Sequence, residues 1–420
     1  MTNGDARTLL LLGLPTLGLS LAITAVAVFV PVILQAHTSS SAVAGVIVGA
    51  EGILALVLPL LLGSISDRTR TRIGGRLPFL LVALVPCVGG LVAIPLAGSL
   101  GAIAASVAAF YVGYYVYYPP YRALFPDLVP RELLGRSQGV QTVFRELGLG
   151  AALVGAPLLL ALSRSLPFVF AAALLVVVTV VLVVLVVHLP PANGAEEPHA
   201  SGLVGAGDIR ALLRRDPELV RLLVANGLWE LSLGALKTFV VLYIVEGAGM
   251  SSAMASLLLG IVAGVALVAA PIAGHLADRH GGVRVSRIAL GVYGIGLLLP
   301  AFTTSLFALL PTLPVVGFGG AVAMTLPYAL VAARLPALSH GAGAGLYELS
   351  RGIGVMLGPI LAGLAVDLAR PWLPATRGYG AMWIVASAAV LASIPLLPRG
   401  EPTAARSERR TAANALDART

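Results

Sequence analysis

Hydrophobic segments long enough to cross a lipid bilayer follow one another along the whole chain. A transmembrane helix needs about 20 predominantly apolar residues, and twelve segments of this kind can be counted. They lie near residues 9–34, 42–62, 77–97, 102–126, 137–162, 166–188, 218–246, 252–276, 285–304, 306–333, 342–368 and 379–397. The sequence therefore predicts an all-α membrane protein with twelve transmembrane helices.

Composition excludes a water-soluble protein. Charged residues make up 11% of the 420-residue chain and hydrophobic residues 58%, whereas soluble domains carry about 25% charged residues. The polar surface is too small to dissolve the folded chain in water. The single cysteine, Cys87, lies within a span, so it permits no internal disulfide and no cysteine metal cluster.

Basic residues predict the orientation of the chain in the membrane. Lys and Arg collect in alternate connections, near residues 68–76, 131–136, 210–221, 279–287 and 406–410. The intervening connections lack them, except for Arg164, Arg370 and Arg377. By the positive-inside rule both termini are expected in the cytoplasm, in a multi-pass protein of the plasma or inner membrane. The net charge of +8 is then explained by topology, and we expect membrane lipid but no nucleic acid as a partner.

The chain divides into two halves that repeat each other. The stretch "GSISDR" at residue 63 returns as "GHLADR" at 274, and "GVQTVFRELG" at 139 returns as "GLYELSRGIG" at 345. We expect six-helix halves at 1–188 and 218–398, a cytoplasmic linker at 189–217 and a disordered cytoplasmic tail at 399–420. Internal duplication in an all-helical membrane protein is typical of secondary transporters.

The repeated loop carries a resemblance to a known family. Gly-x-x-x-Asp-Arg followed by a basic cluster, after the second span and again after the eighth, resembles the signature loop of the major facilitator superfamily. The longer form "SDRTRTRIGGRLPF" resembles the glycoside-pentoside-hexuronide cation symporters and the sucrose-type transporters. The stretch "YRALFPDL" resembles an element of the sucrose-type branch, which places Arg122 and Asp127 in that pattern.

The resemblance implies uptake of a sugar or glycoside by alternating access, by a monomer without a cofactor. Two departures from the branch pattern concern its ion. Only Arg76 remains of three basic residues before Pro-Phe, and the second span has Ala55 and Pro59 where melibiose-type members place acidic residues. We therefore expect proton coupling in place of a sodium site, and no metal.

The repeated loops also predict a latch at the cytoplasmic side. Glycines there allow a loop to pass close under neighbouring helices, and Asp67 and Asp278 can accept from the open N–H groups that begin a helix in the opposite half, near Gly341 and Gly135. The alternative is that the arginines only set topology and bind lipid headgroups. The expected latch comprises Gly63, Asp67, Arg68, Arg76, Arg122, Asp127, Gly274, Asp278 and Arg279.

Charged residues inside spans are costly and point to function. Glu51 and Arg351 lie at similar depths in spans that touch in the superfamily fold, so we expect an ion pair between them. Glu348 lies one turn before Arg351 on the same face of the helix, so it can pair with Arg351 as well. The alternative is a static salt bridge between the halves. The residues assigned to proton coupling are Glu51, Arg145, Glu348 and Arg351.

Two further spans predict a substrate site. Asn226, Glu230 and Lys237 form one stripe of the seventh span with Trp229 beside it, which suits a sugar because the polar groups can bind hydroxyls and the indole can stack on a pyranose ring. The alternative for Lys237 is snorkelling to the outer interface. The fourth span, "FYVGYYVYYPPYRALF", adds tyrosines. The expected substrate-binding residues are Tyr114, Tyr118, Asn226, Trp229, Glu230 and Lys237.

Other function classes remain as alternatives to sugar uptake. The stretch "RELGLGAALVGAP" partly resembles an element of proton-antiporting drug exporters, so export of a drug-like metabolite is the second hypothesis. A sensor or scaffold without transport is the third. The sequence has no metalloprotease, nucleophile-elbow or phosphate-loop motif, so we expect neither an enzyme nor an ATP-driven pump.

Overall fold

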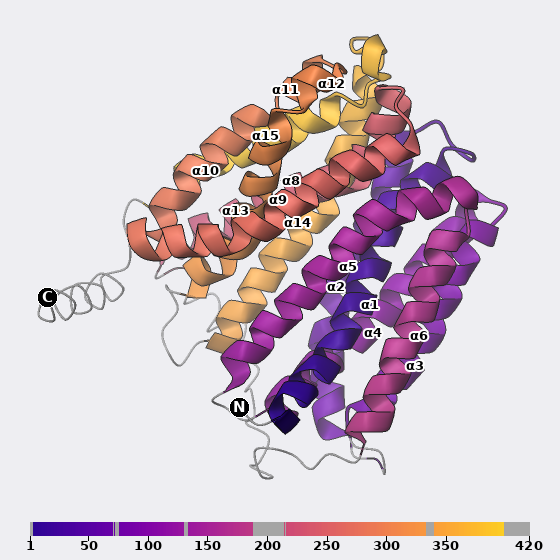
Figure 1. The fold of residues 1–420 in the computed structure, drawn as a ribbon, viewed down its shortest axis with the longest axis vertical. Coiled ribbons are helices and arrows are strands. Elements are labelled where there is room, and N and C mark those ends of the chain that lie inside the picture. The colour runs from indigo at the N-terminus through magenta and orange to yellow at the C-terminus, as the bar shows by residue number, and fades with distance from the viewer. Residues whose placement is uncertain are drawn as a thin grey trace, which may run out of the picture.

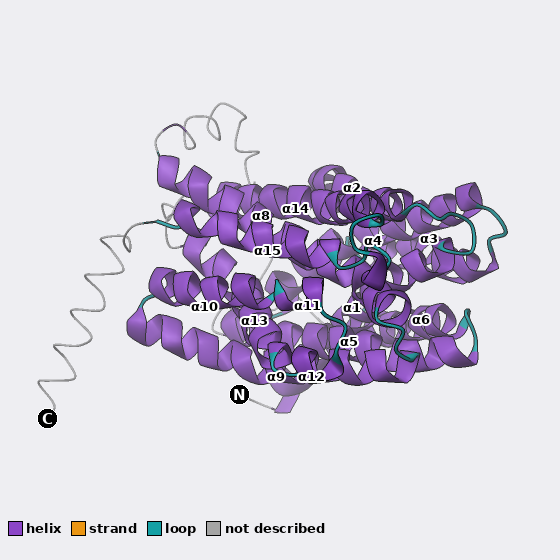
Figure 2. Ribbon diagram, turned by 90° about the horizontal axis from the view of Figure 1, so that it is seen from above, coloured by secondary structure: helices purple, strands orange, loops and turns teal. Residues whose placement is uncertain are grey.

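The protein is built from helices. The computed structural model describes residues 3–69, 71, 75–129, 133–187, 214, 216–332 and 340–398, and Figure 2 draws this part as helices joined by loops, without a strand. Within it, ten helices are long and apolar enough to cross a membrane, and shorter apolar helices cover Thr312–Pro327 and Ala381–Leu396. The expected all-α membrane class is confirmed. Most of the predicted linker, and the predicted tail, lie outside the described residues.

The helices fall into two consecutive groups. The first contains α1 (Asn3–Leu34), α2 (Ser41–Arg68), α3 (Leu77–Ala93), α4 (Leu100–Leu128), α5 (Leu134–Leu162) and α6 (Leu166–Val186). The second contains α8 (Pro217–Leu242), α9 (Ser252–His280), α10 (Gly282–Gly296), α11 (Leu299–Phe302), α12 (Leu306–Leu309), α13 (Thr312–Ala332), α14 (His340–Ala369) and α15 (Ala381–Ser393). In Figure 1 the first group, indigo to magenta, lies on one side and the second, rose to yellow, on the other.

Local chemistry explains where several helices begin. The first N–H groups of a helix have no partner within the helix, and a side-chain oxygen often accepts from them. Ser99 accepts from the N–H of Ala102 at the start of α4, and Asp216 accepts from the N–H groups of Glu218 and Leu219 at the start of α8. Between α9 and α10 the chain reverses at Gly281, whose φ of 93° favours glycine.

The two groups meet most closely along α2 and α14. A β-carbon at Gly45 would collide with the carbonyl oxygen of Pro359, and one at Gly52 would collide with that of Gly352. A β-carbon at Gly363 would collide with the carbonyl oxygen of Ser41. Glycine is therefore required on both helices for the backbones to approach this closely.

This contact lies toward one end of the molecule. We call that end, which carries residues 35–40 and 370–380, the outer end, and the opposite end, which carries residues 69–76, the inner end, after the orientation expected from the basic residues. At the outer end residues of the two groups bond directly, as described below. Nearer the inner end, a β-carbon at Gly139 of α5 or Gly274 of α9 would meet no atom within 4 Å. Figure 1 shows the lower ends of α5 and α9 diverging.

Candidate functional site

Charged side chains of α8 and α14 form ion pairs within the second group of helices. The Nε atom of Arg351 lies 3.6 Å from Oε1 of Glu230 on α8, and its Nη1 atom lies 3.3 Å from Oε2 of Glu348 on α14. The side chain of Glu348 is 49% exposed, whereas that of Glu230 is 17% exposed. Arg351 thus holds two carboxylates that differ in their access to solvent.

Glu51 of α2 brings a carboxylate from the first group of helices. It is 5% exposed and accepts a hydrogen bond from the Tyr115 hydroxyl at 3.2 Å. The expected ion pair between Glu51 and Arg351 does not occur among the described residues. Glu230 takes that place, because α8 packs against α14 so closely that a β-carbon at Gly354 would collide with the carbonyl oxygen of Gly227.

Lys237 connects these groups electrostatically. Its ammonium lies close enough to Glu51, Glu230 and Arg351 for their charges to act on it. The seventh-span stripe therefore places Glu230 and Lys237 in one charged region with Glu51. We call the ion cluster the set Glu51, Glu230, Lys237, Glu348 and Arg351.

Several tyrosines of α4 anchor this helix to its neighbours. Tyr111 donates to the carbonyl oxygen of Val48 on α2 at 3.3 Å. The hydroxyls of Tyr117 and Thr179 on α6 lie 2.9 Å apart. Tyr121 donates to the carbonyl oxygen of Leu12 on α1. These rings are buried, and their hydroxyls serve packing within the first group of helices.

Tyr114 and Tyr118 form a separate pair on α4. Their rings stack with centroids 5.7 Å apart and an interplanar angle of 13°. Both are partly exposed, and the charges of Arg351 and Glu51 act on Tyr114. The guanidinium of Arg122 lies 5.8 Å from the centroid of the Tyr118 ring. This pair offers an aromatic surface beside the ion cluster.

Asn226 lies on the same side of α8 as Glu230, facing α14, whereas Trp229 faces α15. Asn226 is fully buried, and its Nδ2 atom donates to Oγ of Ser350 on α14 at 2.7 Å. Trp229 is 1% exposed and donates from Nε1 to Oγ of Ser393 on α15 at 2.7 Å. Residues 229 and 230 project about 100° apart on a helix, so Trp229 enters the core while Glu230 faces Arg351.

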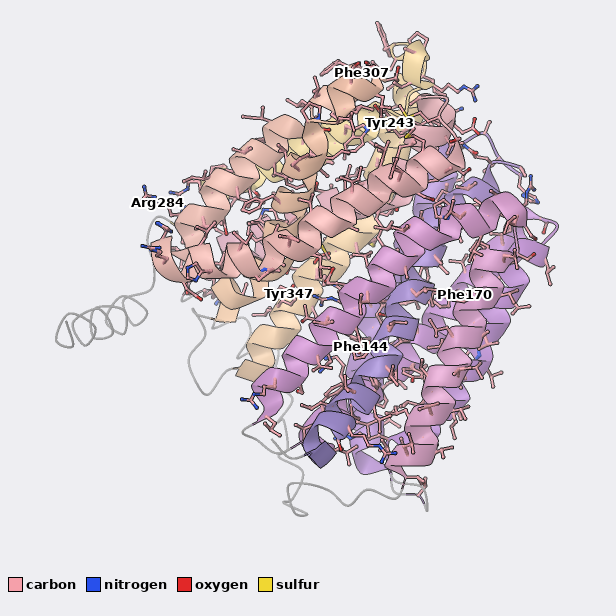
Figure 3. The ribbon with its side chains drawn as sticks, in the orientation of Figure 1. Phe144, Phe170, Tyr243, Arg284, Phe307 and Tyr347 are labelled. Carbon is pink, nitrogen blue, oxygen red and sulfur yellow. The ribbon has the colours of Figure 1, made fainter. Side chains whose placement is uncertain are left out.

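Arg145 lies apart from the carboxylates of the ion cluster. Its Nε atom is 3.2 Å from Oε1 of the adjacent Glu146 on α5, and its side chain is 49% exposed. Its charge acts on Tyr347 of α14, which is labelled in Figure 3. Phe144, also labelled in Figure 3, instead packs on Gly13 of α1.

Arg76 and Asp127, two residues of the expected inner latch, pair with each other within the first group of helices. The Nε atom of Arg76, just before α3, lies 2.5 Å from Oδ2 of Asp127 near the end of α4. This ion pair joins the loop after the second span to the end of the fourth. The side chains of Gly63, Asp67 and Arg68 lie outside what the structure describes.

The part of the latch on α9 lies at the surface of the molecule. Asp278 and Arg279 are exposed near the end of α9. No hydrogen bond or ion pair of Asp278 is found within the described part of the chain.

A direct seal between the two groups occurs at the outer end, which sequence reasoning missed. The carboxylate of Asp367, near the end of α14, accepts from the N–H groups of Ser41 and Ala42 at 2.8 and 2.9 Å, and from the Ser40 hydroxyl at 2.7 Å. Arg370 donates to the carbonyl oxygen of Ser39. One feature of the sequence could have indicated this contact: Arg370 is one of the arginines that lie outside the expected basic connections.

A second contact of the outer seal joins the end of α1 to the loop before α15. Nε2 of Gln35 donates to the hydroxyl of Tyr379 at 2.8 Å. Burial raises the pKa of the Tyr379 phenol, so it stays protonated at neutral pH. A cavity of about 650 Å³ opens beside these residues, lined by both groups and by Arg377, which pairs with Glu246 at 2.6 Å. This cavity lies at the seal and apart from the ion cluster.

The described residues include no group of three or more His, Cys, Asp or Glu placed to hold a metal ion. The chemistry available at the ion cluster is therefore hydrogen bonding, ion pairing and proton exchange by carboxylates. A partly exposed aromatic pair lies beside it. Such a set can bind a polar solute and change its own charge.

The sequence matches the model of the Major Facilitator Superfamily over residues 12–268 and 222–418. No match is found among the curated proteins. Solved structures give similar folds at low sequence identity.

Three solved transporters illustrate the shared fold. A bacterial homologue of the human lysosomal transporter Spinster, inward-facing and unoccupied, has a TM-score of 0.73 at 15% identity, over 94% of this chain and 96% of that chain. The nucleoside transporter NupG has a TM-score of 0.75 at 16% identity, over 93% and 98%. A bacterial homologue of the iron transporter ferroportin, inward-facing, has a TM-score of 0.69 at 18% identity, over 93% and 98%.

Proposed function

Because this chain belongs to the major facilitator superfamily, we propose that it takes up a sugar or glycoside by proton-coupled alternating access. The protein is a multi-pass membrane transporter and not an enzyme. What we propose is the substrate class, the proton as the coupling ion and the direction of transport. The observation that carries the proposal is the ion cluster with the Tyr114–Tyr118 pair beside it.

The charge balance of the ion cluster supports a proton as the coupling ion. It contains three carboxylates, Glu51, Glu230 and Glu348, against two cations, Lys237 and Arg351. With every group ionised its net charge is −1. A charge inside a membrane protein is costly unless it is paired. Binding one proton would neutralise the cluster.

Glu51 is the carboxylate best placed to carry that proton. Glu230 and Glu348 each lie within 4 Å of Arg351, whereas the hydrogen-bond partner of Glu51 is the neutral phenol of Tyr115. The hydrogen-bond partner of Glu51 therefore carries no charge, unlike the guanidinium beside the other two carboxylates. Glu51 and Arg351 also lie in different groups of helices, so their separation changes when the groups rock against each other.

The tyrosine pair supports a sugar or glycoside as the substrate. The apolar face of a pyranose ring can stack on an aromatic surface while its hydroxyls bond to charged groups. Tyr114 and Tyr118 provide the surface, and Glu230, Lys237 and Arg351 provide acceptors and donors nearby. We therefore assign the stacking surface to Tyr114 and Tyr118 on α4 and not to Trp229.

The arrangement of the two groups supports an inward-facing state. The outer seal is formed by Asp367 and Gln35, and the inner ends of α5 and α9 lack close contacts at Gly139 and Gly274. In this state a substrate at the ion cluster would leave toward the side that carries the basic loops. Proton release to the same side would complete one uptake step.

The test of this proposal is uptake of labelled sugars and glycosides into proteoliposomes under an imposed proton gradient. We expect accumulation that requires the gradient and stops when a protonophore dissipates it. Accumulation of a tested sugar by a gradient of opposite sign would support the exporter hypothesis. If no tested sugar accumulates in response to the proton gradient, sugar symport is contradicted.

A pair of substitutions tests where the substrate binds. Glu230→Gln should abolish sugar transport while leaving the amount of folded protein unchanged, because the amide cannot hold Arg351 by charge. Trp229→Phe is the matched control: it removes the hydrogen bond to Ser393, which costs about 1 kcal/mol of stability, but it should leave the KM for sugar unchanged. Normal transport by Glu230→Gln would show that Glu230 serves packing.

A further inference from the structure

The bond between Asp367 and α2 caps a helix from the opposite group of helices. The first N–H groups of α2 need acceptors. Ser40 supplies one from its own loop, since its Oγ lies 3.3 Å from the N–H of Val43. The N–H groups of Ser41 and Ala42 instead point to the two carboxylate oxygens of Asp367. The start of α2 is therefore completed by a residue of α14.

Arg370 reinforces this cap. Its Nη2 atom lies 3.0 Å from Oδ1 of Asp367, donates to the carbonyl oxygen of Ser39 and lies 3.3 Å from Oγ of Ser41. Gly363, one turn before Asp367, packs directly on the backbone of Ser41. The carboxylate is negative where the helix start is positive. Geometry and charge both favour this contact, and it can exist only while the outer ends are together.

The same pair of helices carries the sequence-predicted latch at its other end. Because α2 and α14 run antiparallel, the end of α2 and the start of α14 lie at the same end of the molecule, and so do the start of α2 and the end of α14. Asp67 precedes the last residue of α2, Arg68, and is expected to cap the start of α14. Asp367 lies two residues before the end of α14 and caps the start of α2. An arginine follows each aspartate, Arg68 directly and Arg370 after three residues.

We infer that α2 and α14 form a switch with a cap at each end, in which Asp367 stabilises the outer-closed state and Asp67 the inner-closed state. The inference rests on alternating access as proposed above, but not on the substrate or the coupling ion. Between the two caps lies the close backbone contact of Gly45 and Gly52 with α14. Rocking about this contact opens one end as it closes the other. The difference in strength between the caps sets the resting conformation.

The experiment measures the conformation of purified full-length protein in lipid nanodiscs without substrate. Cys87→Ser provides a background without native thiol, since Cys87 is the single cysteine. Spin labels on Gly139→Cys and His280→Cys report the distance between the inner ends, and labels on His37→Cys and Trp372→Cys report the outer ends. All four positions are exposed.

Asp367→Asn should shift the population toward the outer-open state by about 5- to 30-fold, the range expected when a contact worth one or two kcal/mol is lost. The outer distance should lengthen and the inner distance shorten together. Asp67→Asn should produce the opposite shift, and the double variant should return toward the distances of the parent. Arg370→Gln should also shift the population toward the outer-open state, but by a smaller factor than Asp367→Asn.

Glu246→Gln is the matched control, because it breaks the ion pair with Arg377 at the same end of the molecule but within the second group of helices. Its distances should not change. Unchanged distances in folded Asp367→Asn and Arg370→Gln, or equal shifts in Asp67→Asn and Asp367→Asn, would overturn the inference. Failure of sugar or proton transport would leave these distance measurements unaffected, so the two proposals can fail separately.

Discussion

At the scale of single residues, carboxylates in neighbouring positions have different partners. Glu230 and Glu348 share the guanidinium of Arg351, while Glu51 accepts from the hydroxyl of Tyr115. An ion pair stabilises the ionised carboxylate, whereas a phenol hydroxyl donates to a carboxylate without bringing a charge. The role of a carboxylate in this cluster is therefore decided by its nearest neighbour and not by its depth in the membrane.

This difference leads to a prediction for Glu51. Glu51→Gln should leave exchange of labelled sugar across the membrane intact, because glutamine still accepts from Tyr115 and resembles the protonated acid. It should eliminate accumulation driven by a proton gradient, since the amide binds no proton. Counterflow and gradient-driven uptake in proteoliposomes measure the two activities.

The control for this prediction is Glu146→Gln, which changes a carboxylate paired with Arg145 outside the ion cluster. It should retain accumulation. If Glu51→Gln retains accumulation as well, the coupling proton lies elsewhere, and Glu230 becomes the next candidate.

At the scale of elements, the contact between α2 and α14 depends on backbones that approach without side chains. The atom opposite Gly45 is a carbonyl oxygen of Pro359, which cannot rotate away as a side chain can. Small residues at such positions give close helix packing in membranes. This contact joins the two groups of helices. A substitution there should therefore change how the groups are placed relative to each other more than it changes the stability of either group.

Gly45→Ala tests this contact. Alanine raises helix propensity relative to glycine by about 1 kcal/mol, but at this position its β-carbon collides with Pro359. We expect folded protein with a lengthened outer distance between spin labels and reduced transport. Gly89→Ala in α3, where a β-carbon meets no atom within 4 Å, brings the same gain in propensity and should leave both readouts unchanged. If Gly45→Ala and Gly89→Ala give the same outer distance and the same transport, the proposed role of the α2–α14 contact is contradicted.

At the scale of the whole molecule, the helices form two groups that bond directly to each other at the outer end. The superfamily match covers both groups. The end that we call inner carries the basic connections, and the positive-inside rule assigns it to the cytoplasm.

Chemical labelling tests this orientation. In a Cys87→Ser background, a membrane-impermeant maleimide should label His37→Cys on intact cells and should label His280→Cys only after permeabilisation. Both positions are exposed, so access is decided by the side of the membrane. The reverse pattern would place the termini outside and would reverse the assignment of the open end.

The amino-acid sequence alone determined the class of protein and the positions of its spans. Twenty apolar residues must become a helix in a bilayer, because hydrocarbon offers no partner for backbone polar groups. The repeated Gly-x-x-x-Asp-Arg loop pointed to the superfamily that the family model then confirmed. These features depend on local composition and spacing, which are read directly along the chain.

The partners of individual side chains were decided only by tertiary structure. Helical periodicity placed Glu230 and Trp229 close together, but the positions of α14 and α15 send one to Arg351 and the other to Ser393. Similar depth in two spans that touch in the superfamily fold placed Glu51 near Arg351 without showing that Glu230 is nearer. Asp367 was missed because its partners lie more than 320 residues earlier in the chain. Which helix faces which residue depends on how the two groups pack, and spacing along one helix cannot reveal it.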